Sequence, residues 1–384
     1  MINSKLKQLL LVAGEAVVIA GITILAVAPV SCKITEQGVK ILGGDYLPPV
    51  LNDFVLLDEK TLQLEFSEKV EVTGYVAAKV TDELFDSEEH SQTFDLSPAI
   101  ERASGIYGSV ACNVTKDESG CLVKVSFEEE MEIGQAYEFY AEVRDFTGNS
   151  LTLALPFAGF NSRVPELMIT EVQTETASQR SSEKKDGTYR NEYVELLVLK
   201  EGNLAGLELC SAYDGEAKKY SFPPIDVKKG EIFVVHMRNH GNGCISESDD
   251  DLSLAWAPYT NPEIRDLWTD IETTTLGNKT DIIIIRNRAD KRLLDAFMFR
   301  AGNIEEWTKT MLEYSCLIDE SGIYESGDIE NAFVTDGLTG VKTLSRKDAG
   351  QIRQRLLDGE ALEFPLPSSA DLWEILAEGD PGRL

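Results

Sequence analysis

The stretch LVKVSF, Leu122–Phe127, alternates apolar and polar residues, and this alternation indicates the fold class. Successive side chains of a β-strand point to opposite faces, so such a stretch buries one face and exposes the other. The same pattern occurs in Thr61–Phe66 (TLQLEF), over 70–80 and in Tyr137–Val143 (YEFYAEV). Because turn-forming Gly, Asp and Ser residues separate these short stretches, we expect them to form an antiparallel β-sandwich.

A second series of strand-like segments follows in the C-terminal half of the chain. It comprises 167–172 (LMITEV), 191–198 (NEYVELLV), 204–209 (LAGLEL), 230–235 (GEIFVV) and 276–285 (LGNKTDIIII). A long insertion over 236–275 separates two of these segments, and a second insertion over 302–340 follows the last of them. The second insertion carries Trp307, Met311 and Tyr314 at helical spacing, which predicts a packed amphipathic helix.

The N-terminus has the parts of a secretory signal. Two lysines precede an apolar stretch over 9–30, and small residues lead to Cys32. The run before this cysteine resembles a bacterial lipobox, in which the cysteine becomes the acylated first residue of the mature chain. Pro29 stands where that motif usually has Leu, a departure found in the relaxed lipobox of spirochaetes. We therefore expect lipid attachment at Cys32.

Two other interpretations of the N-terminus remain open. One is an uncleaved transmembrane anchor, but Glu15 leaves only the 15 residues over 16–30 uninterrupted, fewer than the roughly 20 that span a bilayer. The other is an ordinary signal peptide that is cleaved elsewhere. A mature lipoprotein carries several acyl chains and would be held firmly at the membrane.

The chain is expected to have four parts. They are a lipoprotein signal peptide over 1–31, a glycine-bearing tether over 32–48, a β-sandwich over 49–160 and a second β-sandwich with insertions over 161–384. The predicted fold is thus mainly β, with two tandem β-sandwich domains after an N-terminal signal helix. The second domain is expected to contain inserted loops and one or two short helices.

The charge of the chain excludes one class of partner. Acidic residues outnumber basic ones 66 to 36, and the formal net charge is −30. Nucleic-acid binding is driven by Lys and Arg side chains that displace counterions from phosphates. We therefore expect no nucleic-acid partner and a soluble body outside the membrane.

Six cysteines are present, and two of them flank a turn-rich stretch. Cys112 and Cys121 lie on either side of 115–120 (TKDESG), so they could bridge the two arms of a hairpin in an oxidising compartment. The other interpretation is a pair of strand residues that do not meet. The spacings do not include C-x-x-C and do not resemble a zinc or haem site.

Two short phrases resemble the bacterial Ig-like domain family. Leu64–Val70 (LEFSEKV) is similar to the opening F-S-E-x-V strand of that family, and Val143–Asn149 (VRDFTGN) to its closing D-x-x-G-N turn. Gly and Asn tolerate positive φ at such a turn, and Asp accepts hydrogen bonds from its own turn. The resemblance implies an Ig-like sandwich over about 49–160.

The second domain resembles the lamin-tail domain, an Ig-like β-sandwich. Bacterial members read I-x-E-V, E-Y-V-E-L, L-x-G-L-x-L, F-P and G-x-x-x-V-V, and the chain carries these phrases in this order between 169 and 235. Its C-terminal phrases 343–346 (TLSR), 368–373 (SSADLW) and 380–382 (DPG) are similar to the end of that family. The match covers about 165–384. With 44–46 (GDY) before the first domain, the whole order most resembles spirochaete (Treponema-like) lipoproteins of this build.

The residues suited to catalysis do not form a recognisable motif. The lamin-tail resemblance makes Glu171, Glu192 and Glu195 strand positions, which we expect at a sheet edge or facing solvent rather than in an acid–base site. His236 and His240 have the spacing of a zinc motif, but the Glu of H-E-x-x-H is missing. Nucleophile-elbow, P-loop and dinucleotide-binding motifs are also missing. We expect a protein that is not an enzyme and has no cofactor.

The first insertion contains two candidate binding features. Trp256, Tyr259 and Trp268 form an aromatic-rich loop, which is either a binding surface or a lid folded back onto the core. A run of three acids could hold Ca²⁺, but it lacks the alternating spacing and central Gly of an EF-hand, so a solvated loop is favoured. These acids are Asp249, Asp250 and Asp251.

The expected function is that of a membrane-tethered, non-enzymatic display or scaffold protein of the bacterial cell envelope, on its periplasmic or outer face. It would act by binding a protein or an envelope polymer. Bacterial lamin-tail domains also occur beside secreted nucleases and phosphoesterases, so an accessory module of an exported hydrolase is one alternative. A Ca²⁺-dependent adhesin is another.

Overall fold

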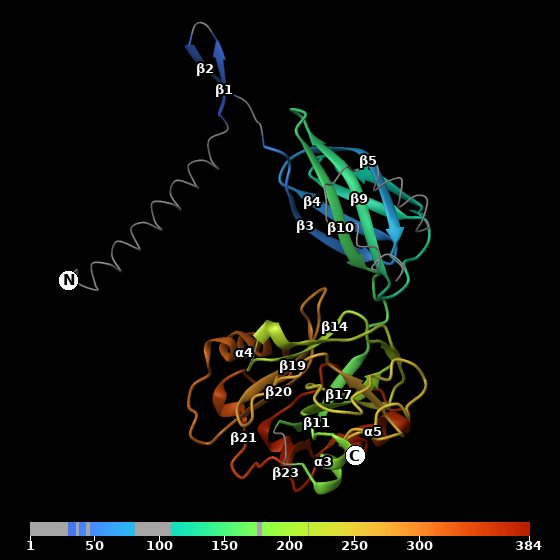
Figure 1. Cartoon of the computed structure of the whole chain (residues 1–384), viewed down its shortest axis with the longest axis vertical. Coiled ribbons are helices and arrows are strands. Elements are labelled where there is room, and N and C mark those ends of the chain that lie inside the picture. Colours follow the sequence, from blue (N-terminus) through green and yellow to red (C-terminus); the bar gives the residue numbers. More distant parts are fainter. Residues whose placement is uncertain (1–29, 36–37, 44–46, 81–108, 175–178, 214) are drawn as a thin grey trace, which may run out of the picture. The chain divides into compact units, whose positions relative to one another are not determined.

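A computed structural model describes the protein over residues 30–35, 38–43, 47–80, 109–174, 179–213 and 215–384 (Figure 1). The predicted signal helix lies outside these residues. The described secondary structure is mainly β, as the sequence predicts. The chain divides into two compact units, of which unit 1 contains Met1–Met131 and Ala136–Phe157, and unit 2 contains Glu132–Gln135 and Ala158–Leu384.

A two-stranded hairpin occupies most of the span that the sequence analysis assigns to a tether. Strand β1 (Val30–Thr35) pairs antiparallel with β2 (Gly38–Gly43), and Cys32 lies opposite Ile41 in the register. The proposed lipid-attachment residue is therefore a strand residue, and cleavage before it would remove the first two residues of β1.

Besides the β1–β2 hairpin, the described residues of unit 1 form two four-stranded sheets. In strand order they are β3 (Leu51–Asp58), β4 (Thr61–Phe66), β8 (Leu122–Phe127) and β7 (Cys112–Lys116), and β10 (Ser150–Ala158), β9 (Ala136–Asp145), β5 (Val70–Lys79) and β6 (Ser109–Val110). In β8, Val123, Val125 and Phe127 are buried, whereas Lys124 and Ser126 are exposed. The predicted alternation is thus confirmed, because every second side chain of β8 enters the core.

The hairpin of β7 and β8 does not support the disulfide that the sequence allowed. Cys112 lies opposite Phe127 in the register, and Cys121 lies just before the other end of β8. At about 3.3 Å per residue, the two positions are roughly 16 Å or more apart along the strands. A disulfide needs Cα atoms within about 7 Å. Cys112 and Cys121 are accordingly free thiols.

The predicted turn between β9 and β10 forms as expected. The Asp145 carboxylate accepts a hydrogen bond from the backbone N–H of Asn149 at 2.8 Å and one from its side-chain amide at 2.6 Å. Gly148 has φ of 93°, which L-residues with a Cβ rarely adopt. The sequence therefore has a glycine at the position of this turn where the backbone adopts a positive φ.

Unit 2 is a sandwich of a six-stranded and a five-stranded sheet. The larger sheet has the order β18 (Arg265–Trp268), β17 (Ile232–His236), β12 (Tyr193–Lys200), β11 (Glu166–Gln173), β22 (Thr343–Arg346) and β23 (Trp373–Leu376). The smaller sheet has the order β15 (Tyr220–Ser221), β14 (Leu207–Ser211), β19 (Asp281–Asn287), β20 (Leu293–Arg300) and β21 (Phe333–Val334). A short pair, β13 (Gly202–Asn203) and β16 (Asp226–Val227), accompanies them.

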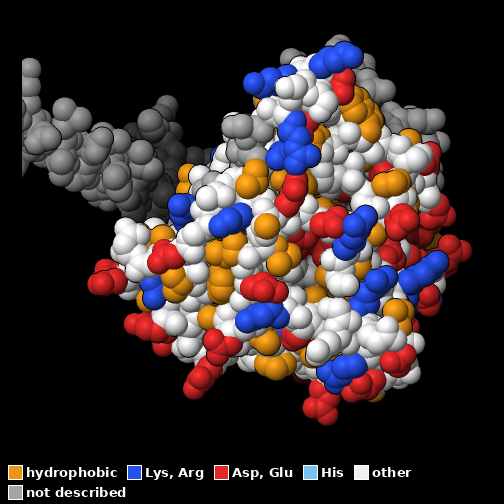
Figure 2. Space-filling model, turned by 90° about the horizontal axis from the view of Figure 1, so that it is seen from below, with side chains coloured by type: hydrophobic (Ala, Val, Ile, Leu, Met, Phe, Trp, Pro, Cys, Tyr) orange, Lys and Arg blue, Asp and Glu red, His pale blue; other side chains and the backbone are white. Residues whose placement is uncertain are grey.

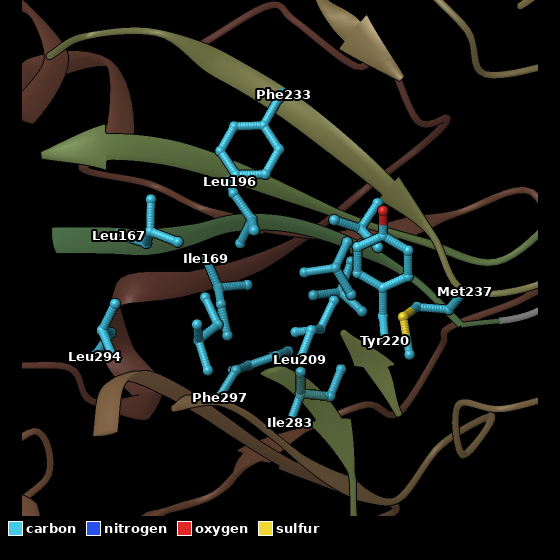
Figure 3. Packing of buried hydrophobic residues seen from close by; sticks show 14 of the residues in the cluster. Leu167, Ile169, Leu196, Leu209, Tyr220, Phe233, Met237, Ile283, Leu294 and Phe297 are labelled. Carbon is cyan, nitrogen blue, oxygen red and sulfur yellow. The ribbon is translucent and has the colours of Figure 1, made fainter. Parts of the chain in front are cut away.

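The main core of unit 2 lies between these two sheets. In Figure 3, Leu196 and Phe233 of the larger sheet point toward Leu209 and Ile283 of the smaller one. Buried apolar side chains of this kind supply the dominant favourable term in folding. The two layers are thus held together by side-chain packing across the sandwich.

Both outer faces of the sandwich are also covered. The helix α5 (Ala349–Leu357) packs on the larger sheet through Ile352 and Leu356, which join a cluster with Leu197 of β12. On the smaller sheet lies α4 (Lys309–Ser321), which the sequence predicted to begin earlier. Its start is fixed by Thr308, whose hydroxyl accepts a hydrogen bond from a backbone N–H of the first turn. Strand β12 is covered by α5 on one face and by the smaller sheet on the other. Residues 193–199 of this strand are therefore all buried, and buried and exposed residues do not alternate along it.

We predict that Phe297→Ala lowers the free energy of unfolding of unit 2 by about 3–5 kcal/mol, the usual cost of removing a buried aromatic ring. Phe297 is fully buried and stacks on Trp373 with ring centroids 3.6 Å apart. The four tryptophans, Trp256, Trp268, Trp307 and Trp373, all lie in unit 2. Urea unfolding followed by tryptophan fluorescence therefore reports on this unit.

A matched control is Leu312→Ala on the exposed side of α4, where the side chain is 55% exposed. This variant should unfold within about 0.5 kcal/mol of the native protein. Equal midpoints for the two variants would contradict the assignment of Phe297 to the core.

Candidate binding site

Three segments of unit 2 that are far apart in the sequence enclose an open pocket of about 630 Å³ with a mostly polar lining, here called the polar pocket. The first segment contains the short helix α3 (Ser181–Asp186) and the residues up to 190. The second is the loop 256–263 of the first insertion, and the third is the C-terminal segment 378–383. Pockets of this size are suited to small ligands or to single groups of a larger one.

Arg190 is the most buried charged residue that lines the polar pocket. Its side chain is 4% exposed, and its Nε donates to Glu183 Oε1 at 3.1 Å. Its guanidinium carbon lies 6.0 Å from the centre of the Tyr259 ring. Within the described part of the chain, Arg190 Nη2 and the neighbouring Tyr259 hydroxyl lack a hydrogen-bond acceptor or donor of good geometry. Burial of a single arginine leaves no pattern in the sequence, so Arg190 could be recognised as a site residue only in the structure.

Tyr259 connects the inserted loop to the larger sheet. Its ring packs against that of Tyr193 on β12, with centroids 5.3 Å apart. Its φ of 71° is unusual for a bulky residue, and such backbone strain persists only where the surroundings hold it. Burial raises the pKa of Tyr259, and the positive charge of Arg190 opposes this rise. The hydroxyl is therefore neutral at physiological pH.

The three aromatic residues expected to form one loop surface are separated in the structure. Trp256 is 54% exposed and lines the polar pocket together with Tyr259. Trp268 is instead a buried residue of β18, and its ring stacks on His236 with centroids 3.7 Å apart. Of the two alternatives that the sequence left open, Trp268 fits the one in which the loop folds back, because β18 adds to the sheet edge and places this side chain beside His236 on the covered outer face of the larger sheet.

Buried carboxylates organise the first insertion. Glu247 accepts hydrogen bonds from the backbone N–H groups of Leu254, Ala255 and Asp266. Asp266 in turn bonds His236 Nε2 at 2.7 Å. Because each buried acceptor must find donors, these bonds fix the path of the loop without regular secondary structure.

A pair of buried carboxylates lies beside the polar pocket, under the C-terminal segment. Glu171 of β11 and Glu195 of β12 are opposite each other in the register and are 4% and 0% exposed. Tyr193 Oη donates to Glu171 Oε1 at 2.9 Å, and Thr170 Oγ1 donates to Glu195 Oε1 at 2.6 Å. The expectation that these glutamates lie at an edge or face solvent is therefore wrong, because β11 and β12 are central strands whose outer face is covered.

The C-terminal segment supplies the remaining donors of this pair. The backbone N–H of Gly382 donates to Glu195 Oε2 at 2.5 Å, and that of Asp380 donates to Glu171. A Cβ at Gly379 would come within 2.3 Å of the Tyr193 hydroxyl, so only glycine fits there. The E-Y-V-E and D-P-G phrases, which lie almost 190 residues apart, thus meet in one hydrogen-bonded group.

Burial raises the pKa of Glu171 to about 7, and the nearby carboxylate of Glu195 adds to this rise. Burial also raises the pKa of Glu195, against the hydrogen bond from Gly382. Two neighbouring buried carboxylates cannot both ionise without a large cost. One proton is therefore expected to stay on the pair around neutral pH.

Glu192 has a different structural role. It accepts hydrogen bonds from the backbone N–H groups of Thr275 at 2.9 Å and Leu276 at 3.1 Å, where the first insertion rejoins the sandwich. Burial raises its pKa. This glutamate therefore ties down the end of the insertion and does not line the polar pocket.

The acidic run of the first insertion does not gather into a cation site. Arg265 donates to the backbone carbonyl of Asp249, Asp250 is fully exposed, and Asp251 accepts from Ser253 at 2.6 Å. Within the described ranges, we find no group of three His, Cys, Asp or Glu side chains that could hold a metal ion. In the same ranges, no helix is both long and apolar enough to cross a membrane.

Charges of both signs are mixed over the face shown in Figure 2. Acidic and basic side chains alternate there with apolar ones, and they do not gather into one large patch of a single sign. Around the polar pocket the same mixing takes the form of ion pairs, Arg180 with Glu378 at 2.5 Å and Arg383 with Asp380 at 3.2 Å. The face seen there offers no continuous basic surface of the kind that binds nucleic acid.

More than half of the chain matches a known protein family. The family model described as "TP_1001_2nd: protein second domain" matches residues 165–375. The chain belongs to this family. The matched residues run from the start of β11 into β23 and include strands of both sheets of unit 2. The third segment of the polar pocket, 378–383, begins shortly after the end of the match.

A relative from Treponema pallidum (strain Nichols), described as an uncharacterized protein, is 25% identical over 227 residues. These residues make up 59% of this chain and 54% of the relative, so the chain spans about half of the relative's length. The Ig-like and lamin-tail resemblances of the sequence remain predictions.

Two solved structures are distantly similar. The N-terminal part of the bacterial S-layer protein SbsC matches 49% of this chain and 40% of its own, at 16% identity and a TM-score of 0.22. A DUF4876 family protein from Bacteroides thetaiotaomicron matches 72% of this chain and 82% of its own, at 11% identity and a TM-score of 0.27.

We predict that Glu171→Gln reduces the pH dependence of stability between about pH 4.5 and 7. The pKa of Glu171 is higher in the folded than in the unfolded protein, so the native protein loses stability as pH rises through this window. The loss attributable to this group is on the order of 3 kcal/mol, and a neutral glutamine removes it. Urea unfolding at a series of pH values measures the difference.

Glu374→Gln, at an exposed position of β23, is the matched control and should keep the native pH profile. A Glu171→Gln profile as steep as that of the native protein would contradict the raised pKa.

We further predict that EDTA leaves the melting temperature unchanged, because Asp249, Asp250 and Asp251 bond different partners or face solvent. Thermal unfolding with 1 mM CaCl₂ (about physiological for extracellular sites) and with excess EDTA provides the measurement. A Ca²⁺-dependent shift that disappears in Asp251→Asn would restore the adhesin alternative.

Proposed function

We propose that the protein is a non-enzymatic, lipid-anchored scaffold of the bacterial cell envelope that holds an envelope component in the polar pocket. The observation that carries the proposal is Arg190, a buried cation with an unsatisfied donor that lines an open pocket on a well-packed sandwich. Twelve buried side-chain atoms of the described residues lack a hydrogen-bond partner of full geometry, and the two that line the polar pocket are Arg190 Nη2 and the Tyr259 hydroxyl. A partner that brings an acceptor to this donor would remove its desolvation cost.

The carboxylate pair supports a binding role over a catalytic one. Glu171 and Glu195 are buried under residues 379–382, and their oxygens already accept hydrogen bonds from Tyr193, Thr170 and Gly382. A general acid or base must come within hydrogen-bond reach of the proton that it transfers. The covered pair cannot reach a ligand in the pocket without displacement of the C-terminal segment, so its role is to hold that segment in place.

The envelope location is supported by the N-terminal sequence. A basic start, an apolar stretch over 9–30 and a small-residue approach to Cys32 are typical of an exported lipoprotein. Several acyl chains at this residue would hold the protein at a membrane, with both units outside the bilayer. The Ig-like and lamin-tail resemblances agree with a display scaffold that presents its loops to a partner.

We predict that Cys32→Ala abolishes lipid attachment. The native protein should partition into the detergent phase of a Triton X-114 extraction, whereas the variant should move to the aqueous phase because its acyl chains are lost. Cys316→Ala, at an exposed cysteine of α4, is the control and should partition as the native protein does. A Cys32→Ala variant that stays in the detergent phase would contradict lipid anchoring at this residue.

We predict that Trp256→Ala impairs binding to the envelope. The full chain, kept in detergent, is mixed with the delipidated insoluble envelope fraction of a spirochaete and sedimented. The native protein should sediment with this fraction, and Trp256→Ala should lose at least tenfold in affinity, about 1.4 kcal/mol, because a central aromatic contact is removed.

Tyr213→Ala provides a matched control, since Tyr213 is 54% exposed like Trp256 but does not line the polar pocket. It should sediment as the native protein does. The proposal is wrong if the native protein stays in the supernatant, or if Trp256→Ala sediments unchanged.

A further inference from the structure

The chemistry of the polar pocket restricts what it can bind. Arg190 presents a buried N–H donor at Nη2, while its Nε is already paired with Glu183. The hydroxyl of Tyr259 lies beside Arg190 and interacts with it, but neither this hydroxyl nor Nη2 has a partner of full hydrogen-bond geometry among the described residues. Both groups can donate a hydrogen bond. A ligand that satisfies them must offer an oxygen acceptor at this point of the pocket.

The charge of the residues that line the polar pocket disfavours an anionic ligand. Three arginines and five carboxylates line the pocket, which gives a net charge of −2, and each arginine is already paired with a carboxylate. The carboxylates are Glu183, Asp186, Glu263, Glu378 and Asp380. A negatively charged ligand would be repelled by this surplus. An ammonium or guanidinium group has only donors, so it offers no acceptor to the N–H of Arg190 Nη2. The fitting ligand is therefore neutral but rich in hydrogen-bonding groups.

The shape of the lining favours a saccharide over an extended peptide. Trp256 presents a ring that is 54% exposed at the pocket, and an aromatic face accommodates the apolar C–H face of a sugar ring. Sugar hydroxyls can donate to the surrounding carboxylates and accept from Arg190. The described lining residues lie in a short helix, a loop and the C-terminal segment, and none lies in a strand. A peptide could therefore not bind here by pairing with a sheet edge, the common mode for extended segments.

We propose that the polar pocket binds a neutral saccharide, with a carbonyl or hydroxyl oxygen on Arg190 Nη2 and a ring face against Trp256. This inference rests on the proposed binding role of the pocket and specifies the class of its ligand. An N-acetylated amino sugar fits best, since its amide oxygen is a stronger acceptor than a hydroxyl.

Isothermal titration calorimetry of the full chain with N,N′,N″-triacetylchitotriose tests the proposal, with cellotriose and trigalacturonate as comparison ligands. The two neutral trimers should bind, and each should bind at least tenfold more tightly than the anionic one. Trp256→Ala should weaken binding at least tenfold. Tyr259→Phe, which removes only the hydroxyl, should weaken binding of the neutral trimers severalfold. Arg190→Lys should also weaken this binding, because the planar guanidinium donor is lost.

The control Tyr213→Phe should bind as the native protein does. Arg190 is buried, so Arg190→Lys could unfold; Trp256→Ala and Tyr259→Phe then decide the outcome. The proposal is overturned if neither neutral trimer binds at millimolar concentration, if trigalacturonate binds as tightly, or if both Trp256→Ala and Tyr259→Phe bind like the native protein.

Treatment of the envelope fraction separates this inference from the proposed function. Anhydrous trifluoromethanesulfonic acid cleaves glycosidic bonds, including those of N-acetylated amino sugars that lack a vicinal diol, whereas protease removes polypeptide. A saccharide ligand predicts that the acid treatment abolishes Trp256-dependent sedimentation and that protease does not. Trp256-dependent sedimentation that survives the acid treatment and is lost after protease would overturn the saccharide inference but leave the binding role of the pocket intact.

Discussion

The central strands β11 and β12 of the larger sheet of unit 2 are buried on both faces, and this burial constrains the rest of that unit. The inner face of this sheet packs on the smaller sheet, and its outer face packs on α5 and the C-terminal segment. Glu171 and Glu195 lie on the covered outer face, where unpaired carboxylates would be very costly. Their hydrogen bonds to Asp380 and Gly382 therefore determine where the C-terminal segment must lie.

The polar pocket follows from this arrangement. Once residues 379–382 are fixed over the carboxylate pair, they form one wall of the pocket. Asn261 of the inserted loop donates to the Pro381 carbonyl at 2.9 Å, which holds a second wall against the first. Arg190 lines the same pocket beside Tyr259 of this loop, immediately before the strand-forming phrase that contains Glu195. The short segments that cover the carboxylate pair thus also form the walls of the candidate binding site.

Insertions extend the sandwich without disturbing its core. The first insertion adds β18 parallel to β17 at the edge of the larger sheet, and the bond between His236 and Asp266 ties these strands together. The second insertion contributes α4, which covers the smaller sheet. Long loops on a rigid scaffold are where binding surfaces commonly arise. Here the first insertion supplies Trp256 and Tyr259 to the polar pocket.

The sequence by itself determined the mainly β fold, most strands and the Asp145 turn, because alternation and turn chemistry act over a few residues. It did not determine that Glu171 and Glu195 would be buried, that Trp268 would be covered, or that Cys112 and Cys121 would lie at opposite ends of a hairpin. These outcomes depend on strand register and on what covers each face, which are properties of contacts between distant segments. For the same reason Arg190 became a candidate binding residue only in the tertiary structure, where burial left its donor without an acceptor.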